Sequence, residues 1–396
     1  MFSVLHIRVM IALTAATLLT PLERIEQALL LLEDGVIREV RSRAAYEIPG
    51  DCRVIDFGDG IFAPGLIDIH IHGAAGRDVM NGDPDSLAAI ERFLAKHAVT
   101  SYLPTTITAP VDSTLAALES LANAIDAAGK REDNGELRAR PRGIHIEGPF
   151  LSHAHRGVHP PENLLPPTVE MFAQFWEASR GHIRVMTIAP ELPGAPEVIT
   201  EAARRGVCVS LGHSDADFQA SRAGIAAGAR HATHTFNAMR PLRHRDPGIL
   251  GAVLTDSNLS ADIIADGFHV DPAIVQLFLR AKGPDQAVFI TDSTAATGMP
   301  DGIYRIGTLE MEVKHGVCRV RGTLAGSTLT LDQAVRNVMQ FAHCDLEQVL
   351  RPATLNPARV AGLAGKGILE VGVEADLVVL SPQGEVRNTI ICGAGI

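Results

Sequence analysis

Cysteine is scarce in this chain, and its few residues are widely separated. The five thiols are Cys52, Cys208, Cys318, Cys344 and Cys392. An odd number of scattered cysteines does not build a disulfide framework or a cysteine-based zinc site, and it is typical of a reduced protein of the cytosol. The chain also lacks a Gly-x-Ser-x-Gly turn, and Cys208 falls inside an expected strand, which disfavours a serine or cysteine nucleophile.

Positive charge and long apolar runs are limited as well. Lys and Arg number 35 against 46 Asp and Glu, so the formal net charge is −11 at pH 7. Nucleic acid would be repelled on average, and no local basic patch offsets this. Residues 8–16 resemble the charged and apolar parts of a signal peptide, but no clear cleavage site follows, and the run is shorter than the roughly 20 residues that span a bilayer. We expect a cytoplasmic protein that binds neither nucleic acid nor membranes.

Short β-branched runs alternate with longer amphipathic stretches from residue 61 to residue 290. This alternation is typical of repeated βα units around a parallel sheet. The expected strands are 66–71, 101–105, 143–146, 183–188, 207–211, 231–235, 261–265 and 287–290. The expected helices between them include 84–97, 115–128, 169–179, 195–205, 216–227 and 272–281. Eight such units predict a closed (β/α)8 TIM-like barrel.

Both ends of the chain are rich in strand patterns. Residues 28–40 read as two strands joined by a turn at Asp34-Gly35, which is a strong hairpin signal. Residues 367–380 and 384–392 repeat this pattern, whereas 328–341 and 346–350 read as helices that complete the barrel. We therefore expect a small β-sandwich domain formed by residues 1–60 with 353–396, beside a barrel domain of residues 61–352.

Side chains that bind metals come directly after the expected strands. His70 and His72 end the first strand, and they lie on one face because side chains of a strand alternate with period two. The other candidates follow the third, fifth, sixth and eighth strands, and they are Glu147, His213, His234 and Asp292. Barrel active sites are assembled at these strand ends. The set predicts one or two divalent ions, which could be Zn, Fe, Mn or Co.

A bound divalent ion would make this site hydrolytic, because it lowers the pKa of a water molecule from 15.7 to about 7. Asp292 could orient that water, take its proton and return it to a leaving amine, which is general acid–base catalysis. His269 follows the seventh strand and could polarise a scissile carbonyl or hold an oxyanion. A single histidine after a strand is more often structural, so the prediction depends on the whole set.

Several segments together resemble one known family. The segments are 64–73 (PGLIDIHIHG), 143–150 (GIHIEGPF), 211–214 (LGHS), 233–239 (THTFNAM), 245–248 (RDPG), 265–269 (ADGFH), 291–292 (TD), 324–329 (LAGSTL) and 375–378 (ADLV). They are similar to the N-acetylglucosamine-6-phosphate deacetylases of the amidohydrolase superfamily. The resemblance covers nearly the whole chain, and residues 1–10 have no counterpart in it.

The resemblance implies hydrolysis of the acetamide of N-acetylglucosamine 6-phosphate to glucosamine 6-phosphate and acetate, within amino-sugar metabolism. It implies that Glu147, His213 and His234 hold the catalytic metal and that Asp292 acts as acid and base. Sugar contacts are implied for His159 and His269. The remaining substrate-binding positions that it implies are Asn237 and Ala238 at the phosphate end, together with Leu324, Ala325 and Gly326. Arg245 resembles an arginine that binds phosphate in the neighbouring subunit, which implies a homodimer.

Several alternatives stay open. His70 and His72 are both present, whereas some members of the family lack these histidines and use one metal, so a second ion bridged by Glu147 is plausible here. Arg240 and Arg243 either add attraction for phosphate or belong to a solvated loop. The substrate could instead be N-acetylgalactosamine 6-phosphate or another N-acyl amino sugar. A non-catalytic scaffold relative is a remote alternative, because every ligand position is filled.

Overall fold

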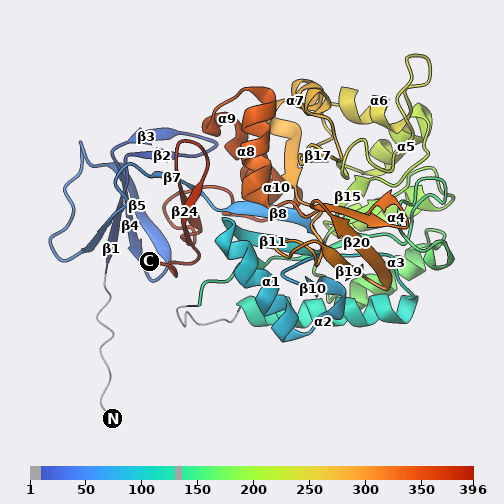
Figure 1. Cartoon of the computed structure of the whole chain (residues 1–396), viewed down its shortest axis with the longest axis horizontal. Coiled ribbons are helices and arrows are strands. Elements are labelled where there is room, and N and C mark those ends of the chain that lie inside the picture. The colour runs from blue at the N-terminus through green and yellow to red at the C-terminus, as the bar shows by residue number, and fades with distance from the viewer. Residues whose placement is uncertain (1–9, 130–135) are drawn as a thin grey trace, which may run out of the picture.

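Parallel strands form the centre of the larger part of the molecule (Figure 1). The computed structural model describes residues 10–129 and 136–396. A seven-stranded sheet contains β12 (Arg140–Pro141), β8 (Leu66–Ile71), β11 (Val99–Thr106), β13 (Ile144–Glu147), β14 (Ile183–Ile188), β15 (Cys208–Leu211) and β16 (His231–Ala232). A second parallel pair consists of β17 (Ala261–Ile264) and β18 (Ala287–Ile290). All eight strands expected between residues 61 and 290 are therefore present, although β16 ends three residues early.

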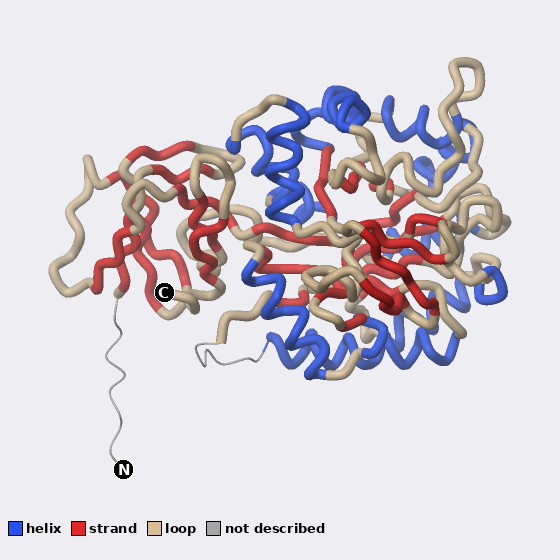
Figure 2. The backbone as a smooth tube through the Cα atoms, viewed as in Figure 1, coloured by secondary structure: helices blue, strands red, loops and turns tan. Residues whose placement is uncertain are grey.

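Helices cover the outside of these strands, as Figure 2 shows. They are α1 (Pro84–Lys96), α2 (Val111–Gly129), α3 (Val169–Ala178), α4 (Ala195–Arg204), α5 (Phe218–Ala227), α6 (Gly248–Thr255), α7 (Pro272–Gln286), α8 (Leu331–Ala342), α9 (Leu346–Ala353) and α10 (Leu355–Val360). Side chains of Asp83, Thr168, Asp217 and Asp271 accept backbone N–H groups at the first turns of α1, α3, α5 and α7. None of the described helices is long and apolar enough to cross a lipid bilayer.

Helices α6 and α10 and one antiparallel sheet were not expected from the sequence. Helix α6 is short and apolar nearly all round, so it carries no amphipathic period. The missed sheet consists of β19 (Gly302–Ile306), β20 (Leu309–Lys314), β21 (Val317–Val320) and β22 (Thr323–Leu324). The sequence does contain a strand pattern in this region, because apolar and charged residues alternate along β20 (LEMEVK), as do its buried and exposed positions. This sheet carries Ile306 and Leu324 to the mouth of the cavity described below.

Strands from both termini combine in the smaller part of the molecule, which lies at one end of the long axis (Figure 1). One sheet has the order β24-β23-β7-β2-β3 and the other the order β5-β4-β1-β6. Their strands are β1 (Ile11–Thr14), β2 (Thr17–Leu19), β3 (Arg24–Glu26), β4 (Ala28–Glu33), β5 (Val36–Ser42), β6 (Arg53–Asp56), β7 (Ile61–Pro64), β23 (Leu377–Leu380) and β24 (Val386–Ile390). The hairpin turn at Asp34-Gly35 is confirmed, with φ of 51° and 71°.

The structure bears on two features of the termini. The apolar run that resembles part of a signal peptide belongs to the fold, because Ile11–Thr14 forms β1, which pairs with both β4 and β6. Residues 1–9 lie outside the described residues. The strand expected over 367–380 starts only at Leu377, because the Gly-rich segment before it bends repeatedly, with positive φ at Gly367 and Gly372.

A partly buried ion network joins Arg142, near the start of β13, to the segment that precedes β23. Arg142 contacts Glu374 at 2.7 Å, and Lys366 contacts both Glu374, at 2.5 Å, and Asp376. Burial would raise the pKa of Glu374, but the bonds from Lys366 and Arg142 lower it from 4.5 to about 2. These two cations therefore favour the ionised carboxylate.

We expect Glu374 to make folding depend on pH in the acid range. Its pKa is lower in the folded chain, so its stabilising contribution is present above pH 4.5 and is lost as the pH falls toward about 2. Urea unfolding at several pH values between these limits measures the effect. The wild-type chain should lose more stability across this range than Glu374→Gln, and parallel losses in both proteins would contradict the role of this carboxylate.

Candidate active site

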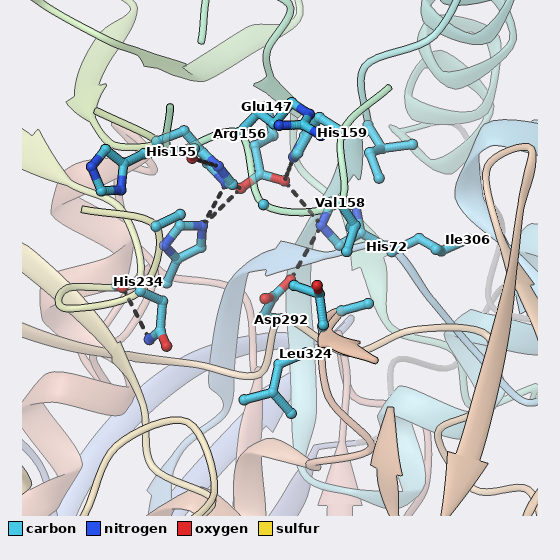
Figure 3. A pocket seen from close by; sticks show the side chains of 18 of the residues that line it. His72, Glu147, His155, Arg156, Val158, His159, His234, Asp292, Ile306 and Leu324 are labelled. Carbon is cyan, nitrogen blue, oxygen red and sulfur yellow. Dashed lines mark hydrogen bonds and ion pairs between the residues drawn. The ribbon is translucent and has the colours of Figure 1, made fainter. Parts of the chain in front are cut away.

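Loops that follow the parallel strands enclose a cavity of about 380 Å³ (Figure 3). The predicted site residues that line it are His72, Glu147, His159, His213, His234, Asn237, Ala238, His269, Asp292, Leu324, Ala325 and Gly326. His70 is fully buried beneath it. Arg245 is not among the lining residues and is exposed. The sequence therefore identified most of the side chains that the fold brings together.

The backbone turns sharply at three of these residues. His213, His234 and Asp292 have φ values of 48°, 31° and 50°, in a region that residues other than glycine rarely adopt. Each follows the end of a parallel strand, so the turn directs its side chain into the mouth of the cavity. Such backbone strain is typical of functional sites, where the surrounding structure has to hold it in place. The sharp turn at His234 also explains why β16 ends three residues earlier than expected, because the chain has to leave the sheet before it reaches His234.

Glu147, His213 and His234 form the first group of candidate metal ligands. Oε1 of Glu147 lies 3.2 Å from Nε2 of His213 and 3.0 Å from Nε2 of His234. The two imidazole nitrogens are 3.0 Å apart. Three ligand atoms from separate βα units therefore face one point.

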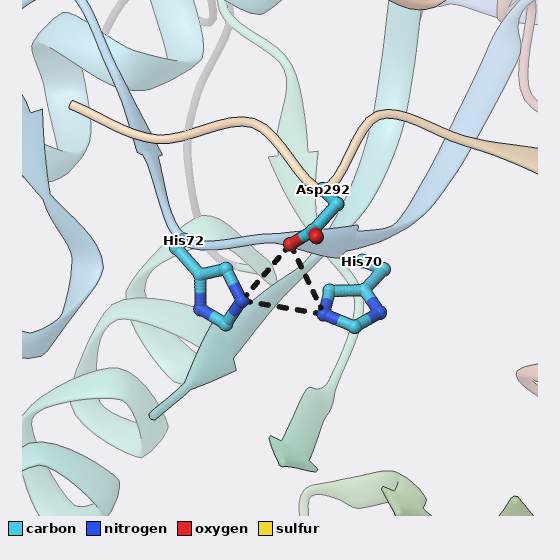
Figure 4. Close-up of side chains that lie close together, drawn as sticks. All are labelled: His70, His72 and Asp292. Atoms are coloured by element: carbon cyan, nitrogen blue, oxygen red, sulfur yellow. Dashed lines mark hydrogen bonds and ion pairs between the residues drawn. The ribbon is translucent and has the colours of Figure 1, made fainter. Parts of the chain in front are cut away.

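His70, His72 and Asp292 form a second group, which Figure 4 shows. Nε2 of His70 and Nε2 of His72 are 3.3 Å apart, and they lie 3.5 Å and 3.2 Å from Oδ1 of Asp292. Glu147 connects the two groups, because its Oε2 lies 3.2 Å from His72 and its Oε1 lies 3.4 Å from His70.

Both groups have spacings that suit a divalent cation. Four ligand atoms placed tetrahedrally at the roughly 2.0–2.1 Å typical of zinc lie about 3.3–3.4 Å from one another. The distances in the two groups run from 3.0 to 3.5 Å. Imidazole and carboxylate ligands suit Zn, Fe, Mn and Co alike. The side chains thus fit the predicted metal site and have enough ligand atoms for two ions.

The two carboxylates of the site are held in their ionised form. Burial alone would raise the pKa of Glu147, but the charge of His70 and hydrogen bonds from the surrounding histidines lower it well below its usual value. Burial likewise opposes ionisation of Asp292, but the charge of His70 and the hydrogen bond from His72 lower the pKa of Asp292 to about 2. Asp292 is therefore a proton acceptor at neutral pH.

The histidines respond to burial and to these carboxylates in opposite ways. Burial lowers the pKa of His213 to about 4, so its ring is neutral, as metal binding requires. Burial also acts on His234, but the nearby carboxylates of Glu147, Asp292 and Asp262 raise the pKa of His234 to about 9. The same negative surroundings that favour a proton on His234 also favour a divalent cation in its place.

Hydrogen bonds from outside the cavity orient the metal-binding rings. Nδ1 of His72 donates to the carbonyl of Thr105 and Nδ1 of His213 to the carbonyl of His155, each at 3.0 Å. These bonds leave Nε2 of both rings free to bind a metal. Nδ1 of His234 has no partner among the described residues. The backbone N–H of His234 instead donates to the carboxylate of Asp262, which is fully buried.

Two buried residues beneath the site, Asp68 and His145, were not predicted from the sequence. Asp68 accepts a hydrogen bond of 2.6 Å from Thr291, and burial raises the pKa of Asp68 to about 6. The ring of His145 lies 4.6 Å from that of His70, and burial lowers its pKa well below the usual value. Both could have been predicted from the alternation of side chains along a strand. Asp68 lies two positions before His70 and His145 two before Glu147, so each shares a strand face with a predicted ligand.

Two further histidines face the cavity from its walls. Nδ1 of His159 lies 2.7 Å from the hydroxyl of Thr108, and its Nε2 lies 3.5 Å from Glu147. Nδ1 of His269 donates to the carboxylate of Asp266 at 2.7 Å, which leaves its Nε2 available to a ligand. His269 is therefore held by a specific partner, as expected of an active-site residue and unlike a free loop histidine.

The arginines of the 240–245 loop have different surroundings. Arg240 forms an ion pair of 2.7 Å with Asp246 and donates to the carbonyl of Asp215, so it braces its own loop. Arg243 is exposed, and its backbone pairs with Asp246. Neither arginine lines the cavity. Of the two alternatives for Arg240, these contacts favour a residue of a solvated loop over one that attracts phosphate into the cavity of its own chain.

Comparisons with known proteins identify the family of this chain. The model of the amidohydrolase family matches residues 61–394. An N-acetylglucosamine-6-phosphate deacetylase from Vibrio furnissii is 37% identical and covers 91% of this chain and 88% of its own. An N-acetylgalactosamine-6-phosphate deacetylase from Escherichia coli O157:H7 is 37% identical and covers 96% of this chain and 98% of its own.

Solved structures show the same relationship. The N-acetyl-D-glucosamine-6-phosphate deacetylase from Mycobacterium smegmatis, a mutant in complex with N-acetyl-D-glucosamine-6-phosphate, has a TM-score of 0.90 and 34% identity. The alignment covers 98% of this chain and 99% of that one. The fold is therefore of the TIM-barrel type found in these enzymes. The chain belongs to the amidohydrolase family, in common with the N-acetylglucosamine-6-phosphate deacetylases that it resembles.

Proposed function

We propose that this protein hydrolyses the N-acetyl group of N-acetylglucosamine 6-phosphate to give glucosamine 6-phosphate and acetate. The observation that carries the proposal is the convergence of Glu147, His213 and His234 beside an ionised Asp292 in one cavity. The names of the relatives supply the substrate. A scaffold role without catalysis is disfavoured, because all the ligand and acid–base positions are filled.

The reaction replaces the amide C–N bond with a C–O bond from water. A divalent ion held by Glu147, His213 and His234 would lower the pKa of that water toward about 7. Asp292 takes the proton of the attacking water and returns it to the nitrogen, so that the sugar leaves as a neutral amine. His159 and His269 line the cavity with fixed ring orientations, which suits them to bind the acetamide oxygen and the sugar hydroxyls.

We also propose that the parallel strands close into a (β/α)8 barrel. Two hydrogen bonds support closure where the sheets are separate. Thr235 N–H donates to the carbonyl of Asp262 at 2.9 Å, and Asp292 N–H donates to that of His70 at 3.0 Å. The proposed domains are 61–352 for the barrel and 1–60 with 353–396 for the small β domain. The sheet of the small domain also takes in β7 (Ile61–Pro64), the first strand after this proposed boundary, through its pairing with β23.

The proposed partner is a second copy of the chain. Arg245 is exposed on a loop that leaves its own cavity, so its guanidinium is free to enter a neighbouring site. An arginine fork suits a phosphate group. A homodimer in which Arg245 reaches the other subunit's phosphate explains this placement. The free thiols of all five cysteines support the expected cytoplasmic location.

The proposal is tested by acetate release from a panel of N-acetyl sugars, with and without the 6-phosphate, beside elemental analysis of the purified protein. We expect the highest kcat/KM on N-acetylglucosamine 6-phosphate and one or two divalent ions per chain. A higher kcat/KM on N-acetylgalactosamine 6-phosphate would replace the substrate but keep the reaction. No acetate from any member of the panel would refute the proposed activity.

Replacing Arg245 with Ala should weaken hydrolysis of the phosphorylated sugar selectively. Losing charged hydrogen bonds to phosphate costs roughly 1.5–3 kcal/mol, which is about 10- to 100-fold in kcat/KM. Steady-state kinetics on the phosphorylated and free sugars measure the selectivity. Mixing Arg245→Ala with an Asp292→Asn chain tests the transfer between subunits, because mixed dimers should contain one complete site. An equal loss on both sugars would count against a phosphate role.

A further inference from the structure

The cavity contains one permanent positive charge from its own chain. Its described lining includes two carboxylates, Glu147 and Asp292, and several histidines, but Arg156 is the single lysine or arginine among the lining residues. A substrate that carries a phosphate dianion needs a cation at its phosphate end. Arg156 is the residue of this chain that can supply one inside the cavity.

The guanidinium of Arg156 has unused hydrogen-bonding capacity. Its Nη1 makes one weak contact, of 3.3 Å, with the carbonyl of His153, and its Nε is buried without a partner among the described residues. No carboxylate of the described chain pairs with it. Arg240 differs, because Asp246 already neutralises it. Arg156 is partly exposed, so its remaining N–H groups can donate to water or to an anionic ligand such as a phosphate.

The loop that carries Arg156 is anchored on both sides. Before it, the carbonyl of His155 accepts from Nδ1 of His213, and Ser152 N–H donates to the carbonyl of His213. After it, the ring of His159 bonds to Thr108. Figure 3 shows His155, Arg156, Val158 and His159 around the same opening. The guanidinium is therefore attached to a fixed part of the wall.

This loop adjoins the segment that contains Asn237 and Ala238. Nε2 of His155 lies 3.2 Å from the carboxylate of Asp215. Ser214, which precedes Asp215 in the chain, donates its backbone N–H to the carbonyl of Ala238 at 3.0 Å. Residues 214 and 215 thus connect the Arg156 loop to the expected phosphate end of the substrate.

We propose that Arg156 binds the 6-phosphate of the substrate from within its own subunit and so determines the preference for phosphorylated sugars. The inference rests on the proposed function and deepens it. Arg156 and Arg245 of the partner subunit would then hold the phosphate from two sides, with a planar fork of donors from each. Arg156 acts on binding and takes no part in proton transfer.

The test compares Arg156→Met, Arg156→Lys and Arg305→Met. Methionine keeps much of the length of the side chain but removes the charge, and lysine keeps the charge but loses the fork. Arg305 is the control, because it is exposed and its neighbour Ile306, rather than Arg305 itself, lines the cavity. We expect Arg156→Met to raise KM for N-acetylglucosamine 6-phosphate about 10- to 100-fold, while kcat/KM for the free sugar stays unchanged. The KM of Arg156→Lys for the phosphorylated sugar should lie between those of the wild type and Arg156→Met. The KM of Arg305→Met should equal that of the wild type.

A second readout does not need turnover. Isothermal titration calorimetry of glucosamine 6-phosphate and of glucosamine measures the same selectivity as a ratio of dissociation constants, and Arg156→Met should reduce that ratio about 10- to 100-fold. An unchanged ratio, or an equal weakening of both ligands, would overturn the role of Arg156. Failure of the proposed function is distinguishable, because the wild-type chain would then release no acetate although the binding ratio could still be compared.

Discussion

Asp292→Asn is expected to lower kcat by about 10²–10⁴-fold, the range typical of the loss of general acid–base catalysis. Asparagine has nearly the same shape but cannot take a proton from water. Asp292 is ionised in the folded chain, because its neighbouring histidines lower its pKa to about 2 against the effect of burial. Steady-state acetate release, measured at saturating substrate, gives the change directly.

Measuring the metal content of Asp292→Asn distinguishes loss of the proton acceptor from loss of a bound metal ion. Asp292 is not one of the ligands of the first group, so the ion held by Glu147, His213 and His234 should remain. Binding of an ion by the second group would be weaker, because Asp292 belongs to that group, with its Oδ1 3.2 Å from Nε2 of His72. Asp301→Asn, a change at an exposed position, should behave as the wild type. Wild-type turnover in Asp292→Asn would remove this carboxylate from the mechanism.

Glu147→Gln is expected to remove both the bound metal and the activity. The carboxylate lies within 3.0–3.5 Å of five histidine nitrogens and touches both groups of ligands. A neutral amide binds a divalent cation poorly and no longer balances the charge of the site. Elemental analysis of the purified variant should find less metal per chain than in the wild type, and acetate release should fall to background.

Thermal unfolding gives an independent measure of the same loss. A ligand at about 1,000 times its Kd stabilises a folded protein by about 4 kcal/mol, so added metal should raise the Tm of the chelator-treated wild type. Glu147→Gln should show a much smaller rise. Glu191→Gln is the matched control, because Glu191 bonds to Ser214 and Asp215 outside the described lining of the cavity. A full metal content in Glu147→Gln would exclude this residue as a ligand.

Local patterns were enough to predict the eight parallel strands and the chemistry at their ends. The alternation of side chains placed His70 and His72 on one face, and the βα period placed Glu147 and His213 at strand ends. These features depend on neighbours close in sequence, which is why they can be read without a structure. The β19–β22 sheet escaped the same analysis, although β20 alternates clearly, because it interrupts the expected order of strands and helices.

The amino-acid sequence by itself determined the type of fold, the family and the side chains that can bind a metal, because these follow from periodicity and from short motifs. Tertiary structure alone decided which of those side chains meet. It brought His70, from the parallel strand β8, within 3.5 Å of Asp292 near the end of β18. It also left Arg245 outside its own cavity and placed Arg156 within the lining. Loop paths and long-range packing set these positions, and neither leaves a periodic signal in the sequence.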